Sequence, residues 1–176
     1  MTDLTVAIGG FGAIGATVAR GLDAGIPGLK LTAASARDHD GARARMAGMA
    51  TPPPVVSLAE LAGMAEVVVE CAPAAVFAEV AEAAIEAGRI FIPLSCGALL
   101  RHPHLEGRAA ATGARIIVPT GALVGLDAVR AAAEGVIHSV HMVTRKPPNG
   151  LAGAPHLVAN NINVENLETA KLVFHG

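Results

Sequence analysis

Short apolar runs alternate with segments of helical periodicity through the first two thirds of the chain. The runs consist of consecutive apolar and often β-branched residues, which is the pattern of strands buried on both faces. Strands are predicted at 4–8, 29–34, 66–71, 89–94 and 115–118. Helices are predicted between them at 14–22, 41–49, 74–87 and 103–112, and a further short one opens at 57–60. This alternation predicts an α/β fold with a doubly wound parallel sheet.

The pattern changes after the last of these strands. A helix is predicted at 126–134. Residues 136–144 partly alternate between apolar and polar, which is typical of an antiparallel sheet with one covered face, and 167–174 predicts a helix running into a strand. We therefore expect one domain over 1–120 and the start of a smaller α+β domain with an antiparallel sheet over 121–176. Because the second piece has too few elements to bury a sheet face, we expect it to be incomplete.

A glycine motif follows the first predicted strand directly. It has the spacing G-x-G-x-x-G and consists of Gly10, Phe11, Gly12, Ala13, Ile14 and Gly15. In a chain with 20 glycines this spacing alone is weak, but a strand precedes it and a helical pattern follows it. In that context Gly10 allows a tight turn, Gly12 lets phosphates approach, and Gly15 lets the helix pack on the strand. The motif predicts a Rossmann-type dinucleotide site, with a purely structural glycine turn as the alternative.

The residues after the second predicted strand bear on which dinucleotide is bound. Ligands of parallel sheets bind outside the carboxyl ends of the strands, and NAD sites usually have an acidic residue after the second one. Here Ser35 is followed by Ala36 and Arg37. Arg37 suits the 2′-phosphate of NADP, because its guanidinium forms a bidentate charged fork. NADP is therefore favoured over NAD. Two alternatives stay open: Asp38 binds the ribose hydroxyl, or Arg37 is only a solvated loop residue without a role in binding.

Small residues mark the other strand ends and one later loop. They are predicted to let the cofactor lie against the backbone, and they are Cys71, Ala72, Ser95, Gly97, Gly121 and Ala122. Two cysteines, Cys71 and Cys96, are too few for a disulfide framework or a four-ligand zinc site. We expect reduced, partly buried thiols.

Composition narrows the function classes. Apolar residues make up 52% of the chain, but its longest apolar stretch, 67–87, is interrupted by glutamates and a proline, so no membrane-spanning helix is expected. A strand begins almost at once, which leaves no room for a signal peptide, and we expect a soluble cytoplasmic protein. The net charge of −2, the lack of a basic block and the 2% aromatic content argue against nucleic-acid binding.

Few side chains suggest catalysis. Seven histidines are present, but none forms an HExxH motif or a Ser–His–Asp arrangement, and no metal site is predicted. Arg145 and Lys146 are the best cationic pair for an anionic substrate, with a solvated turn as the alternative. We therefore identify no catalytic residue in this chain.

Several segments resemble the L-aspartate dehydrogenase family. They are the glycine motif, 70–72, 94–98, 119–128 and 144–148, and the 121–128 segment is the most specific of them. The resemblance implies NAD(P)-dependent oxidative deamination of L-aspartate to iminosuccinate, which hydrolyses to oxaloacetate and ammonia or feeds NAD biosynthesis. It also implies homodimers with the second domain's sheet at the interface. By the same resemblance, Gly10, Gly12 and Gly15 hold the pyrophosphate and Ala122 contacts the nicotinamide side.

Members of that family continue past the position of Gly176, and their catalytic His and an Asn-rich cofactor segment are expected there. The Asn-rich residues 160–164 stand out of that order, so no role is assigned to them. Two other functions stay open. One is a dinucleotide-binding module without turnover, and the other is a different amino-acid or oxo-acid dehydrogenase.

Overall fold

The computed structural model describes residues 2–120 and 125–175. The chain divides into two compact units, 1–124 and 125–176, which are described here one after the other. No helix of the described residues is both long and apolar enough to cross a membrane.

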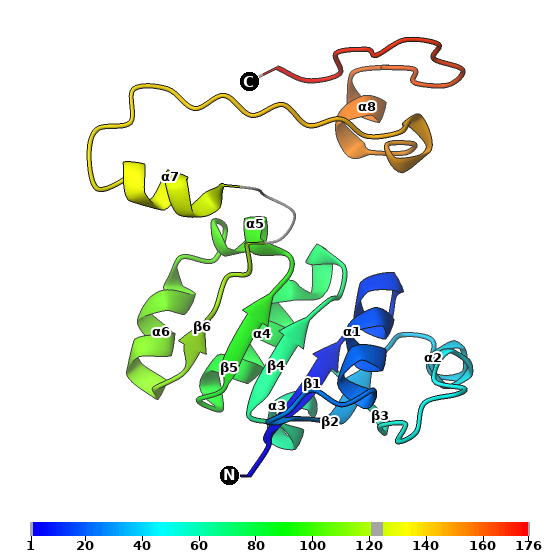
Figure 1. Ribbon diagram of the computed structural model, residues 1–176, viewed down its shortest axis with the longest axis vertical. Helices are drawn as coiled ribbons and strands as arrows, with labels where there is room; N and C mark the ends of the chain where they lie inside the picture. Colours follow the sequence, from blue (N-terminus) through cyan, green and yellow to red (C-terminus); the bar gives the residue numbers. More distant parts are fainter. Residues whose placement is uncertain (1, 121–124, 176) are drawn as a thin grey trace. The chain divides into compact units, whose positions relative to one another are not determined.

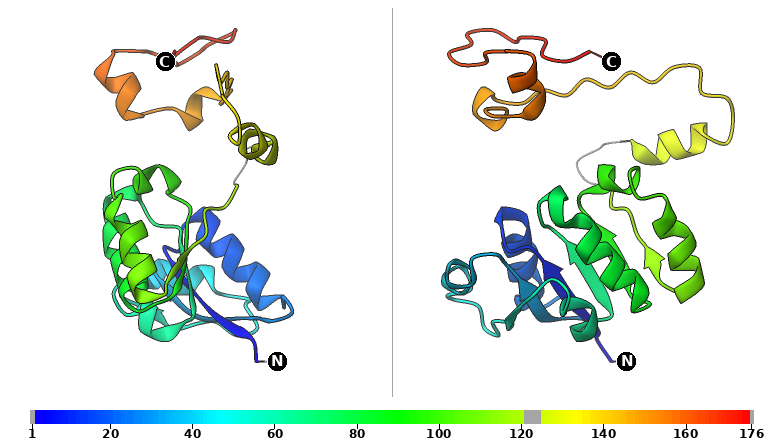
Figure 2. Two further views of the ribbon diagram at one scale, coloured as in Figure 1. Left: turned by 90° about the vertical axis from the view of Figure 1, so that its left-hand side faces the viewer. Right: turned by 180° about the vertical axis from the view of Figure 1, so that it is seen from behind.

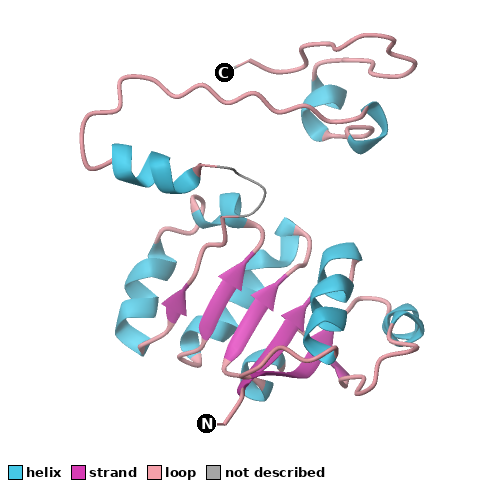
Figure 3. Cartoon of the chain, viewed as in Figure 1, coloured by secondary structure: helices cyan, strands magenta, loops and turns pink. Residues whose placement is uncertain are grey.

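A sheet of six parallel strands forms the centre of the first unit (Figure 1, Figure 3). The strands are β1 Leu4–Gly9, β2 Leu29–Ser35, β3 Val55–Val56, β4 Val67–Glu70, β5 Ile90–Pro93 and β6 Arg115–Ile116. Their order is β3-β2-β1-β4-β5-β6, and every neighbouring pair is parallel. This is the doubly wound Rossmann order. The first three strands are added toward one edge of the sheet and the last three toward the other, so the order reverses between β1 and β4. The predicted α/β sheet is confirmed.

Helices cover both faces of this sheet (Figure 2). They are α1 Ala13–Asp23, α2 His39–Arg45, α3 Leu61–Met64, α4 Phe77–Glu86, α5 Cys96–Leu99 and α6 His104–Thr112, with a 3₁₀ turn η1 at Ala74–Val76. One apolar cluster joins α1 and α2 to one face, and a second cluster joins α3, α4 and α6 to the other. Two covered faces explain why the central strands are mostly apolar and do not strictly alternate with polar residues.

Successive strand residues serve opposite clusters. In β1, Val6 and Ile8 pack beneath α1, whereas Ala7 packs on the α4 side. On that side the rings of Phe77 and Phe91 meet edge to face with centroids 5.8 Å apart. The small Ala side chains let the helices approach the sheet closely, so the alanine-rich composition is a packing feature of this fold.

Some elements differ from the predicted ones. The helix predicted at 41–49 begins at His39, because the Asp38 carboxylate accepts the Gly41 N–H at 2.9 Å and caps its N-terminus. The edge strand β3 was not predicted, since two residues are too short to show a period. Its pairing to β2 includes a hydrogen bond from the Ala34 N–H to the Pro54 carbonyl. The short helix α5 was also not predicted.

The second unit contains helices and loops. Its elements are α7 Leu126–Ala132, a 3₁₀ turn η2 at Pro148–Gly150 and α8 Pro155–Ala159. The predicted antiparallel sheet is wrong for the described residues 125–175, in which no strand forms. Residues 136–144 have a strand-like sequence but no segment hydrogen-bonds alongside them, and a strand needs a partner to satisfy its backbone groups. The helix and strand predicted at 167–174 are absent as well.

Candidate functional site

The glycine loop after β1 is held between the ends of two neighbouring strands. Gly10 has a φ of +108°, and its N–H donates to the Ser35 carbonyl at the end of β2 at 3.0 Å. A Cβ on Gly10 would lie 2.6 Å from the Cys71 carbonyl oxygen and 2.8 Å from the Ala72 Cα. The loop therefore passes β4 backbone against backbone, and no side chain fits at this position.

Gly15 and Gly12 serve different purposes. A Cβ on Gly15 would overlap the Gly10 carbonyl oxygen and come 3.2 Å from the Ile8 Cγ2, so α1 packs against the loop only because Gly15 has no side chain. A Cβ on Gly12, by contrast, would meet nothing within 4 Å. Gly12 is exposed and is the N-cap residue of α1, and no side chain of the described residues caps this helix end. The uncapped N–H groups and the positive end of the helix dipole thus face open space, which suits a phosphate group.

The other residues of the motif divide between core and surface. Phe11 is 3% exposed and packs in the cluster beneath α1, so only its backbone is available to a ligand. Ala13 is exposed, and Ile14 is 58% exposed. The buried face of α1 consists of Gly15, Ala16, Ala19 and Leu22.

Arg37 follows the end of β2 and is not ion-paired within the described part of the chain. Ser35 is buried, and Arg37 is exposed on the bend that follows. The carboxylate of Asp38 is engaged as the cap of α2. Asp38 is therefore less available to a ribose hydroxyl than the sequence suggested, whereas Arg37 remains available.

A buried carboxylate ties the ends of β4 and β5 together. Glu70, the last residue of β4, is 0% exposed. One carboxylate oxygen accepts the Ala72 N–H at 2.9 Å, and the other accepts the Ser95 N–H, also at 2.9 Å. The Ser95 hydroxyl donates to the first oxygen at 3.1 Å. Ala72 and Ser95 are thus held in place by the same side chain, just beyond their strands.

The two cysteines near these strand ends are free thiols. Burial, and then the charge of Glu70, raise the pKa of the Cys71 thiol to about 11, so this thiol stays protonated at neutral pH. The Cys71 N–H donates to the Gly9 carbonyl at 2.7 Å and continues the parallel ladder into the loop. Cys96 donates its S–H to the Pro93 carbonyl. Both residues are structural parts of this edge of the sheet.

Most of the predicted cofactor residues meet at the carboxyl edge of the sheet. The residues that end or follow β1, β2, β4 and β5 there are Gly10, Phe11, Gly12, Ala13, Ile14, Gly15, Ser35, Arg37, Cys71, Ala72, Ser95 and Gly97. Gly121 and Ala122 lie outside the described residues. Glu70 was not predicted as a site residue, although a charged residue ending the apolar strand Val67–Glu70 is a visible signal.

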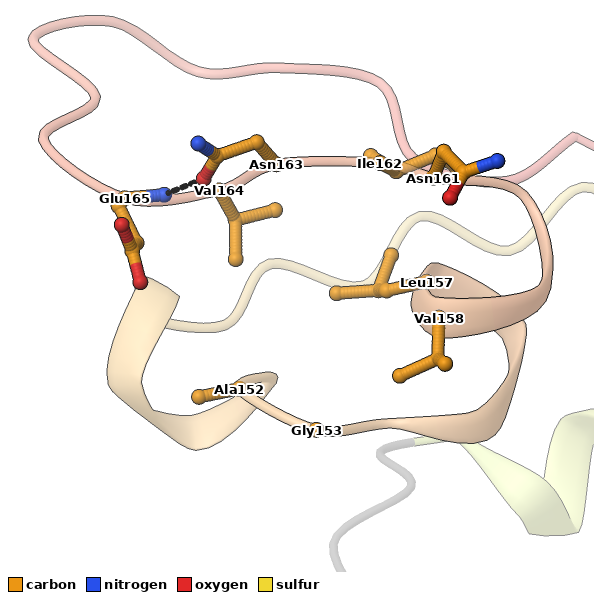
Figure 4. Close-up of a pocket in the computed structure, with 9 residues that line it drawn as sticks. All are labelled: Ala152, Gly153, Leu157, Val158, Asn161, Ile162, Asn163, Val164 and Glu165. Atoms are coloured by element: carbon orange, nitrogen blue, oxygen red, sulfur yellow. Dashed lines mark hydrogen bonds between the residues drawn. The ribbon is translucent and has the colours of Figure 1, made fainter.

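The predicted substrate residues lie in the second unit. Arg145 and Lys146 are exposed and precede η2 in a stretch without secondary structure. The same unit holds a pocket of about 380 Å³ between α8 and residues 161–165 (Figure 4). Leu157 and Val164 are its buried residues, and the Asn163 side chain accepts the Glu165 N–H at 2.7 Å. Because the lining is mainly apolar and its amide is engaged locally, the pocket is a small core rather than a site for an anion.

Two protein-family models match the chain. The NAD-binding domain of homoserine dehydrogenase matches residues 10–119, and the C-terminal part of aspartate dehydrogenase matches 127–176. L-aspartate dehydrogenase of Bradyrhizobium diazoefficiens and L-aspartate dehydrogenase 3 of Bordetella bronchiseptica are each 46% identical to 99% of this chain. The chain spans 62% and 64% of the lengths of these relatives.

A solved structure supports the fold. Apo scyllo-inositol dehydrogenase from Lactobacillus casei superposes with a TM-score of 0.58 over 76% of this chain and 41% of that one, at 14% identity. The sheet order and the glycine loop define the class, a Rossmann-type NAD(P)-binding oxidoreductase domain. Within that class, the chain belongs to the L-aspartate dehydrogenase family. The resemblance drawn from the sequence is confirmed.

Proposed function

We propose that this protein works as an NAD(P)-dependent L-aspartate dehydrogenase, which oxidatively deaminates L-aspartate to iminosuccinate and thus serves NAD biosynthesis. The observation that carries the proposal is the open, uncapped N-terminus of α1 at Gly12, in a chain 46% identical to L-aspartate dehydrogenases. A bound NAD(P)⁺ would supply the hydride acceptor. The chain's own contribution is to bind and orient that cofactor.

The cofactor contacts follow from the order of the strand ends. Backbone N–H groups at Gly12 and the start of α1 hold the pyrophosphate, since no side chain obstructs them. Gly10 forms the tight turn that brings them there, and its own N–H donates to the Ser35 carbonyl. The small residues Cys71, Ala72, Ser95 and Gly97 leave room for the ribose and nicotinamide against the backbone. Gly121 and Ala122 are proposed to complete the nicotinamide side.

NADP is proposed as the preferred cofactor. The free guanidinium of Arg37 favours a 2′-phosphate, and the engagement of Asp38 as a helix cap removes the nearest acidic partner for a 2′-hydroxyl. Both observations argue in the same direction, and neither depends on the family resemblance.

The remaining proposals concern the whole protein. Residues 1–120 serve as the cofactor domain, and 121–176 belong to a domain for substrate binding and dimerisation. Arg145 and Lys146 bind the substrate carboxylates, because they are adjacent exposed cations in that second segment. The protein is proposed to be a cytoplasmic homodimer.

Binding and turnover should be tested separately. Calorimetric titration with NADP⁺ and NAD⁺ measures binding, and we compare Gly12→Ala with Gly21→Ala. Gly12 is the N-cap residue of α1 and Gly21 lies within the helix, and both have open space at the Cβ position. Only Gly12 is at the predicted phosphate site. We expect both variants to fold and only Gly12→Ala to weaken binding, by about tenfold or more. Equal binding by both variants would contradict the site.

Turnover is followed by the absorbance of NAD(P)H formed with L-aspartate, using D-aspartate and L-glutamate as controls. We expect reduction with L-aspartate only. A folded sample that binds NADP⁺ but forms no NADPH would refute deamination by this chain and would favour a binding module without turnover. Reduction with another amino acid would point to a different dehydrogenase.

A further inference from the structure

Glu70 is the one fully buried ionisable side chain among the described residues, and it lies at the carboxyl edge. Its three hydrogen-bonding partners are two backbone N–H groups, which only donate, and the Ser95 hydroxyl. This arrangement of donors suits the ionised carboxylate, because a carboxylate accepts only.

The carboxylate has no cationic partner. None of the ion pairs formed by the described residues includes Glu70. Buried charges in proteins are normally paired with an opposite charge. The three hydrogen-bond donors stabilise the carboxylate but leave its net charge unchanged. The structure therefore holds a negative charge beside the proposed cofactor site, and no cation of the described residues forms an ion pair with it.

The field of this charge extends along the same edge. The negative charge of Glu70 contributes to the raised pKa of the neighbouring Cys71 thiol, after the larger effect of burial. Cys71 and Ala72 in turn contact the glycine loop at Gly10. A ring lying on the ends of β4 and β5 would thus experience a negative potential from Glu70, whose charge is screened less in its buried position than it would be in water.

We propose that Glu70 is the counter-charge for the oxidised nicotinamide ring, so that the site binds NAD(P)⁺ in preference to NAD(P)H. The oxidised ring carries a positive charge and the reduced ring is neutral, while the rest of the molecule is the same in both forms. The inference rests on the proposed function, since it requires the nicotinamide to lie over Ala72 and Ser95. Glu70 would then do more than join two strands. It would also make the site bind the oxidised form of the cofactor more tightly than the reduced form.

The test compares two glutamates at opposite ends of one strand. Glu70→Gln keeps the shape and removes the charge at the carboxyl end of β4. Glu66→Gln makes the same change just before β4, where the carboxylate accepts the Thr5 N–H and hydroxyl. The dissociation constants of NADP⁺ and NADPH are measured for each variant by calorimetry and nucleotide fluorescence, without any turnover.

We expect Glu70→Gln to lower the preference for NADP⁺ over NADPH by about tenfold, and Glu66→Gln to leave it unchanged. Equal weakening of both forms by Glu70→Gln would mean that Glu70 only positions Ala72 and Ser95, and this would overturn the proposal. An unchanged preference would overturn it too. Failure of the unmodified protein to bind either nucleotide would instead refute the proposed function.

A second variant applies if Glu70→Gln does not fold. Ser95→Ala leaves the carboxylate in place and removes one of its three donors, so the charge is less compensated. We then expect the preference for NADP⁺ to rise by about twofold. A preference that stays the same or falls would contradict a counter-charge at Glu70.

Discussion

Gly10 and Cys71 meet backbone to backbone between β1 and β4, where the order of the strands in the sheet reverses. A Cβ on Gly10 would lie 2.6 Å from the Cys71 carbonyl oxygen, and the Cys71 N–H donates to the Gly9 carbonyl at 2.7 Å. The glycine loop is thereby fixed to β4 as well as to β1. This contact places the loop before α1 beside the end of β4, where the cofactor site is proposed.

Replacing Gly10 should lower the stability of the protein, both because its φ is positive and because a side chain would collide with the backbone at Cys71. Gly10→Ala combines a positive φ with a collision against backbone atoms, and we expect it to lower the free energy of unfolding by about 3 kcal/mol or more. Gly25→Ala is the matched control, because Gly25 has a φ of +98° but open space at the Cβ position. We expect that variant to lose about 1–2 kcal/mol. Urea unfolding measures both, and equal losses would show that the contact with Cys71 is unimportant.

Gly15 sets the distance between α1 and the loop. We expect Gly15→Ala to cost about 3 kcal/mol, because its Cβ would overlap the Gly10 carbonyl oxygen. Gly21→Ala, on the exposed side of the same helix, should instead stabilise the protein by about 0.5–1 kcal/mol. Thermal unfolding of the two variants checks the opposite signs. A neutral Gly15→Ala would mean that α1 can shift away from the loop freely.

The Cys71 thiol should make stability depend on alkaline pH. Its pKa is raised from 9.0 to about 11, so the folded protein keeps the proton longer than the unfolded chain. The contribution of this group is complete below pH 9 and is lost as the pH rises toward 11. We expect Cys71→Ala to show a smaller fall in unfolding midpoint over this range than the unmodified protein. The same alkaline loss in both would contradict the assignment.

The same pKa predicts slow alkylation, since the thiolate is the nucleophile. In a Cys96→Ser background only Cys71 reacts, and we expect iodoacetamide labelling to increase until about pH 11. Adding Glu70→Gln should move the labelling profile to lower pH, because it removes the second cause of the shift. A profile that does not move would show that burial alone raises the pKa.

Arg37 should decide between the two dinucleotides. Arg37→Ala removes the free cation after β2, and we expect NADP⁺ binding to weaken by about tenfold or more while NAD⁺ binding changes little. Arg45→Ala is a suitable control, because Arg45 is another exposed arginine, at the end of α2. Calorimetric titrations with both dinucleotides provide the comparison. If Arg37→Ala weakens both equally, NADP selectivity does not depend on this side chain.

The sequence predicted helices and strands well where an apolar pattern was long or where a glycine clearly marked the end of a helix. The strands at β1, β2, β4 and β5 were found because each lies in a mostly apolar run. The ends of helices α4 and α6 were found because Gly88 and Gly113 follow them with positive φ. Two residues such as Val55–Val56, by contrast, carry no period, and only pairing with β2 makes them a strand.

The sequence by itself determined the parallel sheet, the glycine loop after β1 and the family, because these depend on the order and spacing of residues along the chain. Tertiary structure decided the strand order, the burial of Phe11, the exposure of Ile14 and the bridge from Glu70 to Ser95. It also decided that residues 136–144 form no strand. The physical reason is that a side chain's partner, or a strand's neighbour, lies far away in sequence, and no local pattern specifies it.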